Sequence, residues 1–269
     1  MRARVVGPGS VALSMLSVCA IGMLYASEAS ATDATAQHGA SVPVLVELFT
    51  SEGCSSCPPA DAALLTLATE QPIPGAEIIA LEEHVDYWDR LGWTDPFSSR
   101  AFSIRQDAYS EAFGTKQIYT PQMIVDGRME LVGSDVSRAR QAVAGATRSP
   151  KASIRIIGGP TFSAEILTVR IESAPVDGGA EEPELWAAIT EDGLSTDVRS
   201  GENGGRRLRH GAVVRALQMV TRLGSTGTAE ARFHIGKDWN RERLRVVAFV
   251  QDSTTRRVLG VTAAPVFAR

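Results

Sequence analysis

Cysteine is scarce in this sequence, which has only Cys19, Cys54 and Cys57 among its 269 residues. No second pair accompanies the closely spaced Cys54 and Cys57, so no internal partner can pass electrons to them. Structural zinc usually has four Cys or His ligands, and no second cluster of such residues is apparent, which disfavours a structural zinc site. Sulfur chemistry is therefore confined to one CxxC segment.

Positive charge is not in excess either. Lysine and arginine number 27 against 31 aspartates and glutamates, which gives a formal net charge of −4. A mildly acidic protein has no general attraction for nucleic acid or anionic lipid, so we expect neither as a partner. The sequence also shows no internal repeat and no long low-complexity tract.

The N-terminal segment is organised like a secretory signal. Two arginines precede an apolar stretch from Val11 to Ala26, and the small-residue motif Ala29-Ser30-Ala31 follows it. This pattern predicts a signal peptide over residues 1–31 and a periplasmic or secreted protein. The stretch is short for a membrane span, so we expect none after cleavage, with a retained anchor as the alternative. Cleavage would remove Cys19, and the CxxC would then form the one possible internal disulfide.

Length and composition predict two domains. The chain has 269 residues. Even after removal of residues 1–31, it is longer than the roughly 100–150 residues typical of one domain. Residues 32–41 are small and polar and are expected to form a flexible arm. The composition changes after Pro150, so we predict one domain over residues 42–149 and a second over residues 150–269.

Hydrophobic spacing in residues 42–149 predicts alternating strands and helices. A continuous apolar run of strand length is typical of a strand covered on both faces. Helical spacing and serine or aspartate caps indicate the helices, and an Asp-Gly pair supplies the positive φ of a hairpin turn. The predicted elements are a strand over Pro43–Thr50, a helix over Asp61–Glu70, a strand over Glu77–Val85, a helix over Ser98–Phe113, hairpin strands over Gln122–Val125 and Arg128–Val132, and a helix from Ser134 or Asp135 to Thr147.

Residues 150–269 have a different pattern of apolar and polar residues. Short β-rich runs are separated by glycine, proline and charged turns, which predicts a small antiparallel β-sandwich. The segment GENGGRRLRHG, Gly201–Gly211, is too rich in glycine for a strand. We interpret it as a solvated loop, with an anion pocket formed by its arginines as the alternative.

Several blocks of the sequence together resemble a known family. They are ELFTSEGCSSCPPAD, HVDYWDRLGWTDPFSS, RQDAY, YTPQMIVDG and GENGGRRLRHGAVVRAL. The chain resembles the exported bacterial family catalogued as domain of unknown function 1223, and its CxxC and Thr120-Pro121 resemble the two signature loops of the thioredoxin superfamily. The resemblance implies an α/β thioredoxin-like domain, a mixed sheet with flanking helices, ahead of the β-rich, sandwich-like domain. It also implies a redox role, without an established substrate.

The CxxC lies between the first predicted strand and the first predicted helix. A cysteine at a helix N-terminus has its thiolate stabilised by unpaired backbone N–H groups and the helix dipole. We therefore predict that Cys54 is the more exposed cysteine and the nucleophile, with a thiolate pKa below the ordinary value of about 8.5. Cys57 is then the resolving thiol. Pro58 and Pro59 suit the first helical turn, where an N–H donor has no intrahelical acceptor.

Two further features are expected to support the cysteine pair. Glu47 shares a strand face with Leu45 and Phe49, which predicts an acid beneath the CxxC. Thioredoxins keep a buried acid at a similar place to accept a proton from the resolving cysteine, and a hydrogen-bonded strand acid is the alternative. For Thr120-Pro121, the resemblance implies a cis proline facing the cysteines, with a trans residue at strand entry as the alternative.

These observations predict an exported thiol–disulfide oxidoreductase that uses a Cys54–Cys57 pair on protein or small-molecule thiols. It would need an external redox partner and no resident cofactor. The alternative is an envelope binding module. In one form it carries copper, because Cys54, Cys57 and His84 offer the thiolates and imidazole that suit Cu(I). In the other form it binds a partner and its CxxC is inert. A purely structural disulfide is disfavoured, because so short a loop restrains little unfolded-chain entropy.

Overall fold

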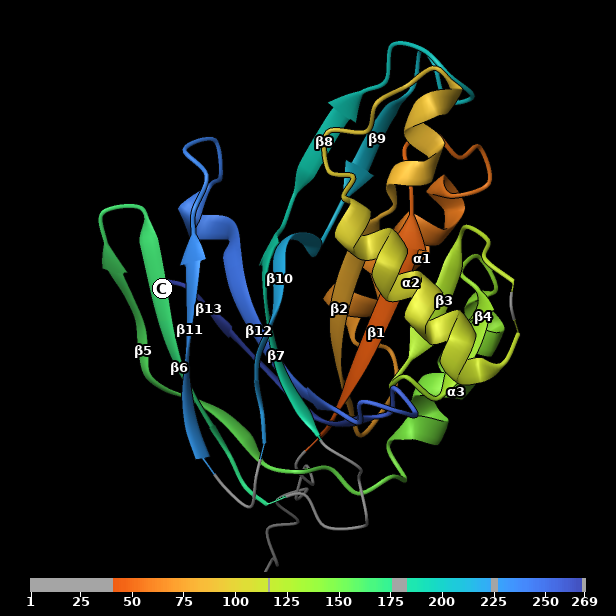
Figure 1. The fold of residues 1–269 in the computed structure, drawn as a ribbon. Helices are drawn as coiled ribbons and strands as arrows, with labels where there is room; N and C mark the ends of the chain where they lie inside the picture. Colours follow the sequence, from red (N-terminus) through yellow and green to blue (C-terminus); the bar gives the residue numbers. More distant parts are fainter. Residues whose placement is uncertain (1–40, 116, 176–182, 224–226, 268–269) are drawn as a thin grey trace, which may run out of the picture. The chain divides into compact units, whose positions relative to one another are not determined.

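The computed structural model describes residues 41–115, 117–175, 183–223 and 227–267. These residues belong to one compact unit, drawn as the coloured ribbon in Figure 1. The predicted signal peptide, and all but the last residue of the predicted arm, lie outside the described residues. None of the helices described is long and apolar enough to cross a membrane.

The order of elements up to residue 149 is the predicted one, with a short 3₁₀ helix added after the second strand. The second helix is capped by Ser99, which accepts a hydrogen bond from the N–H of Ala101 at 3.3 Å. The third is capped by Asp135, which accepts one from the N–H of Arg138 at 3.0 Å. The elements are β1 (Val42–Thr50), α1 (Pro58–Glu70), β2 (Ala76–His84), η1 (Asp86–Leu91), α2 (Arg100–Phe113), β3 (Gln122–Val125), β4 (Met129–Val132) and α3 (Val136–Ala146).

Residues after 150 are rich in strands, as predicted. The runs that alternate or are continuously apolar become strands, and the glycine, proline and charged segments become their connections. The elements are β5 (Ile154–Ser163), β6 (Ile166–Ser173), β7 (Glu184–Glu191), β8 (Leu194–Asp197), β9 (Arg207–His210), β10 (Val213–Arg222), β11 (Gly227–His234), η2 (Arg241–Arg243), β12 (Leu244–Gln251) and β13 (Val258–Pro265).

Strands from both halves of the chain form one sheet, so the predicted fold class is wrong. A single mixed, eight-stranded sheet has the order β13-β12-β7-β10-β2-β1-β3-β4, and Figure 1 shows β10 and β7 continuing the sheet beyond β2. The structure is mostly β. It is therefore not an α/β thioredoxin-like domain followed by a separate sandwich-like domain.

The two halves join at β2, which would otherwise be an edge strand. An apolar edge strand presents unpaired N–H and C=O groups that need partners. The N–H of Glu82 donates to the carbonyl of Ala212 at 2.9 Å, and Val213 of β10 pairs with Glu82 in parallel. Strand β10 then pairs with β7 in antiparallel register. Pairing between distant segments, which local periodicity does not specify, thus continues the sheet.

Alternation along β1 separates two apolar cores. Val44, Val46 and Leu48 pack in one cluster with side chains of α1 and α3, whereas Leu45 and Phe49 pack in another with side chains of α2. A third cluster lies between the three-stranded sheet β11-β6-β5 and strands β7 and β12. Strands β8 and β9 form a two-stranded sheet. The segment that connects them reaches the CxxC.

Candidate functional site

The CxxC segment closes a disulfide where β1 leads into α1. Cys54 and Cys57 are bonded, with their Cα atoms 5.4 Å apart. Cys57 is the N-cap of α1, and Pro58 and Pro59 occupy the first two helical positions, as predicted. The hydroxyl oxygen of Ser56 lies 3.3 Å from the sulfur of Cys54 and can donate a hydrogen bond to it.

Both cysteines are fully buried in this disulfide form. The exposed fraction is 0% for each of Cys54 and Cys57. The prediction that Cys54 is the more exposed cysteine is therefore wrong for this state, although Ser55 and Ser56 between them are exposed. Part of the cover comes from residues 200–206, the cap loop, which belong to the other half of the chain.

The cap loop binds the CxxC segment through two side chains. Asn203 is fully buried, and its amide nitrogen donates to the carbonyl oxygens of Glu52 and Cys54, both at 2.9 Å. Glu202 accepts a hydrogen bond from the N–H of Ser55 at 2.9 Å. The interpretation of Gly201–Gly211 as a solvated loop fits its exposed glycines but misses these contacts. It is also wrong for Arg207–His210, which pair with β8 and form strand β9.

Arginines near the cap loop have separate partners. Arg206 donates to the side-chain oxygen of Asn203 at 2.7 Å, and Arg207 lies 3.8 Å from a carboxylate of β8. These contacts do not support the alternative of an anion pocket. Gly201 allows the loop to come close, because its φ is +74° and an added Cβ would lie 3.1 Å from the Cβ of Trp93.

The peptide bond between Thr120 and Pro121 is cis, which confirms that prediction. The hydroxyl of Ser56 donates to the carbonyl of Thr120 at 3.5 Å. Gly133 lies between this loop and α1, because an added Cβ there would lie 2.9 Å from the Cβ of Ala60 and 3.3 Å from that of Pro121. The loop before β3 therefore lies against the CxxC segment and the start of α1.

Glu47 is fully buried, but it does not lie beneath the CxxC. It lies on the face of β1 that packs against α2, whereas α1 lies on the opposite face. Arg105 donates to its carboxylate at 2.6 Å, and the hydroxyl of Tyr109 donates to it as well. The structure therefore places Glu47 as a paired strand acid, which is the alternative interpretation, and not beneath the disulfide.

Glu47→Gln is expected to cost little stability and to leave thiol–disulfide exchange unchanged. The neighbouring Glu83 is fully buried 3.5 Å from Arg105, and burial, together with the charge of Glu47, holds the pKa of Glu83 well above its usual range. Without Glu47, the Glu83 carboxyl can ionise and pair with Arg105, so the loss should be about 1 kcal/mol. Urea denaturation and the rate of exchange with a model disulfide measure both effects. A rate reduced by more than about tenfold would contradict this structural role.

A buried acid lies one helical turn after the disulfide, in α1 rather than β1. Asp61 is 4% exposed and accepts a hydrogen bond from the hydroxyl of Thr50 at 2.6 Å. It follows Cys57 by four residues, and side chains four apart lie on one face of a helix. Burial, followed by the charge of Glu82, raises the pKa of Asp61 to about 7. Helical periodicity marks Asp61 only as the start of a helix, and its spacing of four residues from Cys57 is the signal in the sequence that points to this position.

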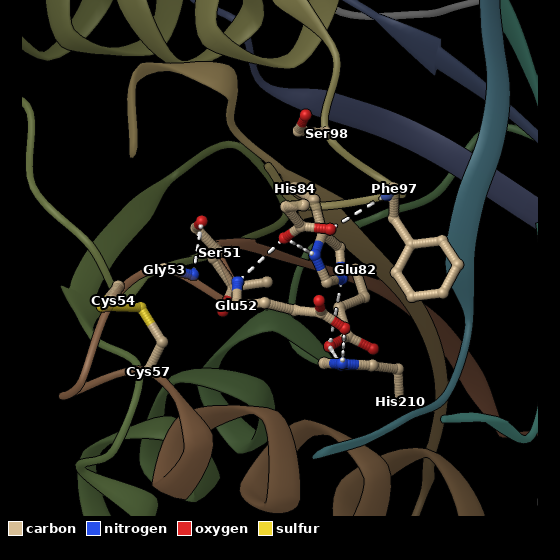
Figure 2. A network of polar contacts seen from close by, with 12 residues as sticks. Ser51, Glu52, Gly53, Cys54, Cys57, Glu82, His84, Phe97, Ser98 and His210 are labelled. Atoms are coloured by element: carbon tan, nitrogen blue, oxygen red, sulfur yellow. Dashed lines mark hydrogen bonds and ion pairs between the residues drawn. A yellow bond between two sulfur atoms is a disulfide. The ribbon is translucent and has the colours of Figure 1, made fainter. Parts of the chain in front are cut away.

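Beside the CxxC, two histidines share one carboxylate (Figure 2). Nδ1 of His210 lies 2.8 Å from Oε1 of Glu82, and Nε2 of His84 lies 3.5 Å from the same oxygen. The other ring nitrogens face two further acids: Nδ1 of His84 lies 2.7 Å from Asp95, and Nε2 of His210 lies 3.1 Å from Glu52. All five side chains are buried, with exposed fractions of 2% or less.

The charges in this network determine its protonation. Burial lowers the pKa of His84, but the charge and hydrogen bond of Asp95 outweigh burial, so that pKa lies well above its usual range. Burial also lowers the pKa of His210, but the charge of Glu82 and the hydrogen bond of Glu52 raise it to about 9. Burial raises the pKa of Glu82, but the charge of His210 lowers it overall. At neutral pH both histidines are therefore cations and Glu82 is an anion.

The structure does not gather the predicted copper ligands. Within the described ranges, the group of Cys, His, Asp and Glu side chains close enough to hold a metal is Glu82, His84 and His210, whose ligand atoms lie within 4.8 Å of one another. Cys54 and Cys57 are not part of it. Glu82 and His84 are two residues apart and therefore lie on the same face of β2, a relation that can be read from the sequence. His210 comes from β9, and only the fold brings it there.

Comparisons with solved structures find the same fold. A protein from Agrobacterium tumefaciens solved by X-ray crystallography is 24% identical, covers 85% of this chain and 96% of its own, and has a TM-score of 0.64. HBP35 of Porphyromonas gingivalis is 14% identical over 84% of this chain and 76% of its own, with a TM-score of 0.61. At these identities the likeness shows the fold alone. No curated protein matches the sequence.

Comparison with family sequence models identifies the family. The family described as "Protein of unknown function (DUF1223)" matches residues 45–251. The match includes the CxxC, strand β2 and the cap loop, and it confirms the resemblance to that family. The chain belongs to the DUF1223 family of proteins of unknown function.

Proposed function

We propose that this protein is an exported thiol–disulfide oxidoreductase whose reactive group is the Cys54–Cys57 pair. The observation that carries the proposal is the position of the disulfide, which closes at the N-terminus of α1, one helical turn before the buried Asp61. A helix start favours the thiolate that attacks disulfides. An acid with a pKa of about 7 can take up and return a proton near neutral pH.

In the reduced protein the exchange has two steps. The thiolate of Cys54 attacks one sulfur of a substrate disulfide, so that the substrate S–S bond breaks, a mixed disulfide forms and the other substrate sulfur leaves as a thiolate. Cys57 then gives its proton to Asp61 and attacks the sulfur of Cys54. This attack closes the internal disulfide and releases the second substrate thiolate, and the substrate has gained two electrons.

The same steps run in reverse when the disulfide form oxidises a substrate dithiol. The part of the chain that the structure describes contains no third cysteine, so the electrons must be exchanged with an external redox partner. The signal-like segment over residues 1–31 supports export to the periplasm or the cell exterior, where disulfides persist. The proposed substrates are protein or small-molecule thiols and disulfides.

A substrate must displace the cap loop before it reaches the sulfurs. Cys54 and Cys57 are both inaccessible in the disulfide form, and Asn203 holds the cap loop on the carbonyl of Cys54. Attack by an external thiol therefore follows local opening, and its rate is proportional to the open fraction.

Asn203→Ala should speed reduction of the internal disulfide by a small water-soluble phosphine, by on the order of tenfold. The change removes two hydrogen bonds that hold the cap loop, and each contributes about 1 kcal/mol. The measurement is acid quenching at timed intervals, followed by alkylation of the free thiols and mass spectrometry.

Asn240→Ala is the matched control for this prediction. Asn240 caps the short helix η2, where its side chain accepts a hydrogen bond from the N–H of Glu242 at 3.1 Å. Equal acceleration in the two variants, or slower reduction in Asn203→Ala, would show that the cap loop does not limit access to the disulfide.

The direct test of the proposed function is the difference between two single-cysteine variants. Cys57→Ser should retain a mixed disulfide with its substrate, and Cys54→Ser should not, because only the first keeps the nucleophile and lacks the resolving thiol. A partner-binding module with an inert CxxC would form no mixed disulfide in either variant.

A further inference from the structure

We propose that Glu82, His84 and His210 form a binding site for one divalent transition-metal ion, with Zn²⁺ as the best-fitting ion. The site shares no residue with the Cys54–Cys57 pair and goes beyond the proposed redox function. Two imidazoles and one carboxylate are ligands that Zn²⁺ takes readily in proteins, with a further position for water. They come from β2 and the end of β9, and their ligand atoms lie within 4.8 Å of one another.

The spacing of the ligand atoms suits a metal ion. Around a tetrahedral Zn²⁺ with bonds of about 2.0–2.1 Å, neighbouring ligand atoms lie about 3.3 Å apart. Nε2 of His84 and Oε1 of Glu82 are separated by 3.5 Å, close to that value. Nδ1 of His210 lies 2.8 Å from the same oxygen, and would move away by about half an ångström when the ion binds.

One buried ring nitrogen points directly to a missing ligand. Nε2 of His84 has no hydrogen-bond partner among the described residues, and the side chain is 0% exposed. Buried polar atoms in folded proteins are nearly always paired, and an unpaired one is costly. This nitrogen is directed at Glu82 (Figure 2). A metal ion between them would give this nitrogen the partner that it lacks.

In each ring, the nitrogen that would not bind the ion has a carboxylate partner, as is usual for histidines in metal sites. Nδ1 of His84 lies 2.7 Å from Asp95, and Nε2 of His210 lies 3.1 Å from Glu52. A carboxylate that accepts the N–H of the far nitrogen orients the ring and makes the near nitrogen a stronger ligand. Each histidine thus has its own carboxylate, and Glu82 is left as the acid that they share.

The charge of the network also accommodates a divalent ion. Three buried carboxylates surround the two imidazoles: Asp95 pairs with the His84 ring, Glu52 pairs with the His210 ring, and Glu82 faces both rings. A divalent ion bound by the rings would therefore be paired with buried carboxylates. A charged group can be buried when it is paired in this way.

Metal binding would join the site to the cap loop. His210 lies four residues after Arg206, the last residue of the cap loop, and Glu52 both faces His210 and accepts a hydrogen bond from Asn203. The three ligands are nearly inaccessible, so an ion enters when the surrounding segments open or when the chain folds. Metal exchange is expected to be slow for this reason.

The test uses the full chain, purified through an affinity tag without histidine, treated with a chelator and then dialysed. The Cys54→Ser/Cys57→Ser double variant is studied beside the oxidised wild type, so that no thiolate is available. Each protein is refolded with Zn²⁺ or with Co²⁺ and freed of excess ion. We expect one bound ion per chain by elemental analysis, a Co²⁺ spectrum with nitrogen and oxygen ligands only, and a Tm raised by about 5–10 °C at Zn²⁺ about 100-fold above Kd.

His84→Gln and Glu82→Gln should each weaken zinc binding by at least about 100-fold. The matched control is His234→Gln, which removes an exposed histidine paired with Glu165 and should bind zinc like the wild type. If a variant folds poorly, the Co²⁺ spectrum of the wild type and of the double cysteine variant decides the ligand type without it.

Several results would overturn the proposal. They are the absence of a bound ion in both the wild type and the double cysteine variant, sulfur ligation in the Co²⁺ spectrum, and unchanged affinity in folded His84→Gln and Glu82→Gln. The site would then be a network of ion pairs only. Because the double cysteine variant has no redox pair, failure of the proposed function leaves this measurement unaffected.

Discussion

Cys57→Ser is expected to accumulate a mixed disulfide with its substrate or redox partner, whereas Cys54→Ser accumulates little. If Cys54 attacks, the only internal group that can release the intermediate is the thiol of Cys57. Loss of that thiol leaves the adduct in place. Expressing each variant with its N-terminal segment in a bacterial host, alkylating after acid quenching and separating the proteins on a non-reducing gel measures the adduct directly.

Burial does not decide which cysteine attacks, because Cys54 and Cys57 are both inaccessible in the disulfide form. The prediction rests on the neighbours of each sulfur. The Ser56 hydroxyl lies 3.3 Å from the sulfur of Cys54 and can stabilise its thiolate, whereas the buried Asp61, four residues after Cys57, is placed to accept the proton of Cys57. The double variant Cys54→Ser/Cys57→Ser is the control for non-specific adducts. Equal trapping by the two single variants, or none by a folded and exported Cys57→Ser, would count against the oxidoreductase.

Asp61→Asn is expected to slow the closing step of the exchange by on the order of 100-fold at pH 7. The asparagine keeps the oxygen that accepts the hydrogen bond of Thr50, but it cannot take the proton of Cys57. Stopped-flow mixing of the reduced protein with a chromogenic disulfide separates the first attack from ring closure. Only ring closure should slow, and its inflection near pH 7 should disappear.

The same substitution should change how stability depends on pH. The pKa of Asp61 is raised from 3.8 to about 7 in the folded protein, chiefly by burial. The folded state therefore holds this proton more tightly than the unfolded state, and the stability it contributes is lost as pH rises from about 4 to about 7. Asp61→Asn lacks this loss and should be more stable than the wild type above pH 7, by about 4 kcal/mol.

Urea denaturation of the oxidised proteins in the presence of a chelator measures this difference. The wild type and Asp61→Asn are compared at intervals from pH 4 to pH 8, so that the other titrating groups, which both proteins share, cancel in the difference. Glu47→Gln is the matched buried-acid control for the kinetics. An unchanged closing rate in Asp61→Asn, or a stability difference that does not vary with pH, would remove Asp61 from the proposed mechanism.

Local chemistry was enough to predict the elements up to residue 149. The apolar run before the CxxC became β1, the Asp126-Gly127 pair became the turn between β3 and β4, with φ values of 52° and 60°, and Asp135 became the cap of α3. Pro58 and Pro59 began α1 as predicted. Each of these features depends on residues close together in sequence, so each can be predicted from local sequence patterns.

The arrangement of the sheet could not be predicted in the same way. Alternating β-rich runs after residue 150 are compatible with a separate sandwich and with a continuation of the first sheet. The choice was made by the free edge of β2, where Glu82 pairs with Val213 and donates to Ala212. Hydrogen bonds between strands far apart in sequence leave no mark on the periodicity of either strand.

The candidate site also has parts that could be predicted from the sequence and parts that could not. From the sequence alone came the CxxC at a helix start and the cis Pro121. Glu82 was not singled out, although it lies two residues before His84 on one face of β2. Only the tertiary structure showed that Glu47 pairs with Arg105. The two faces of β1 contact different helices, and the sequence does not say which helix covers which face.

Tertiary structure also brought distant polar residues to the CxxC. Asn203 covers Cys54 from about 150 positions away, and His210 completes the group with Glu82 and His84. Helix starts, caps and turns are determined by residues that are neighbours in the sequence. The acid near the sulfurs, their cover and the histidine pair depend on which segments meet, and burial and strand pairing decide that across the whole chain.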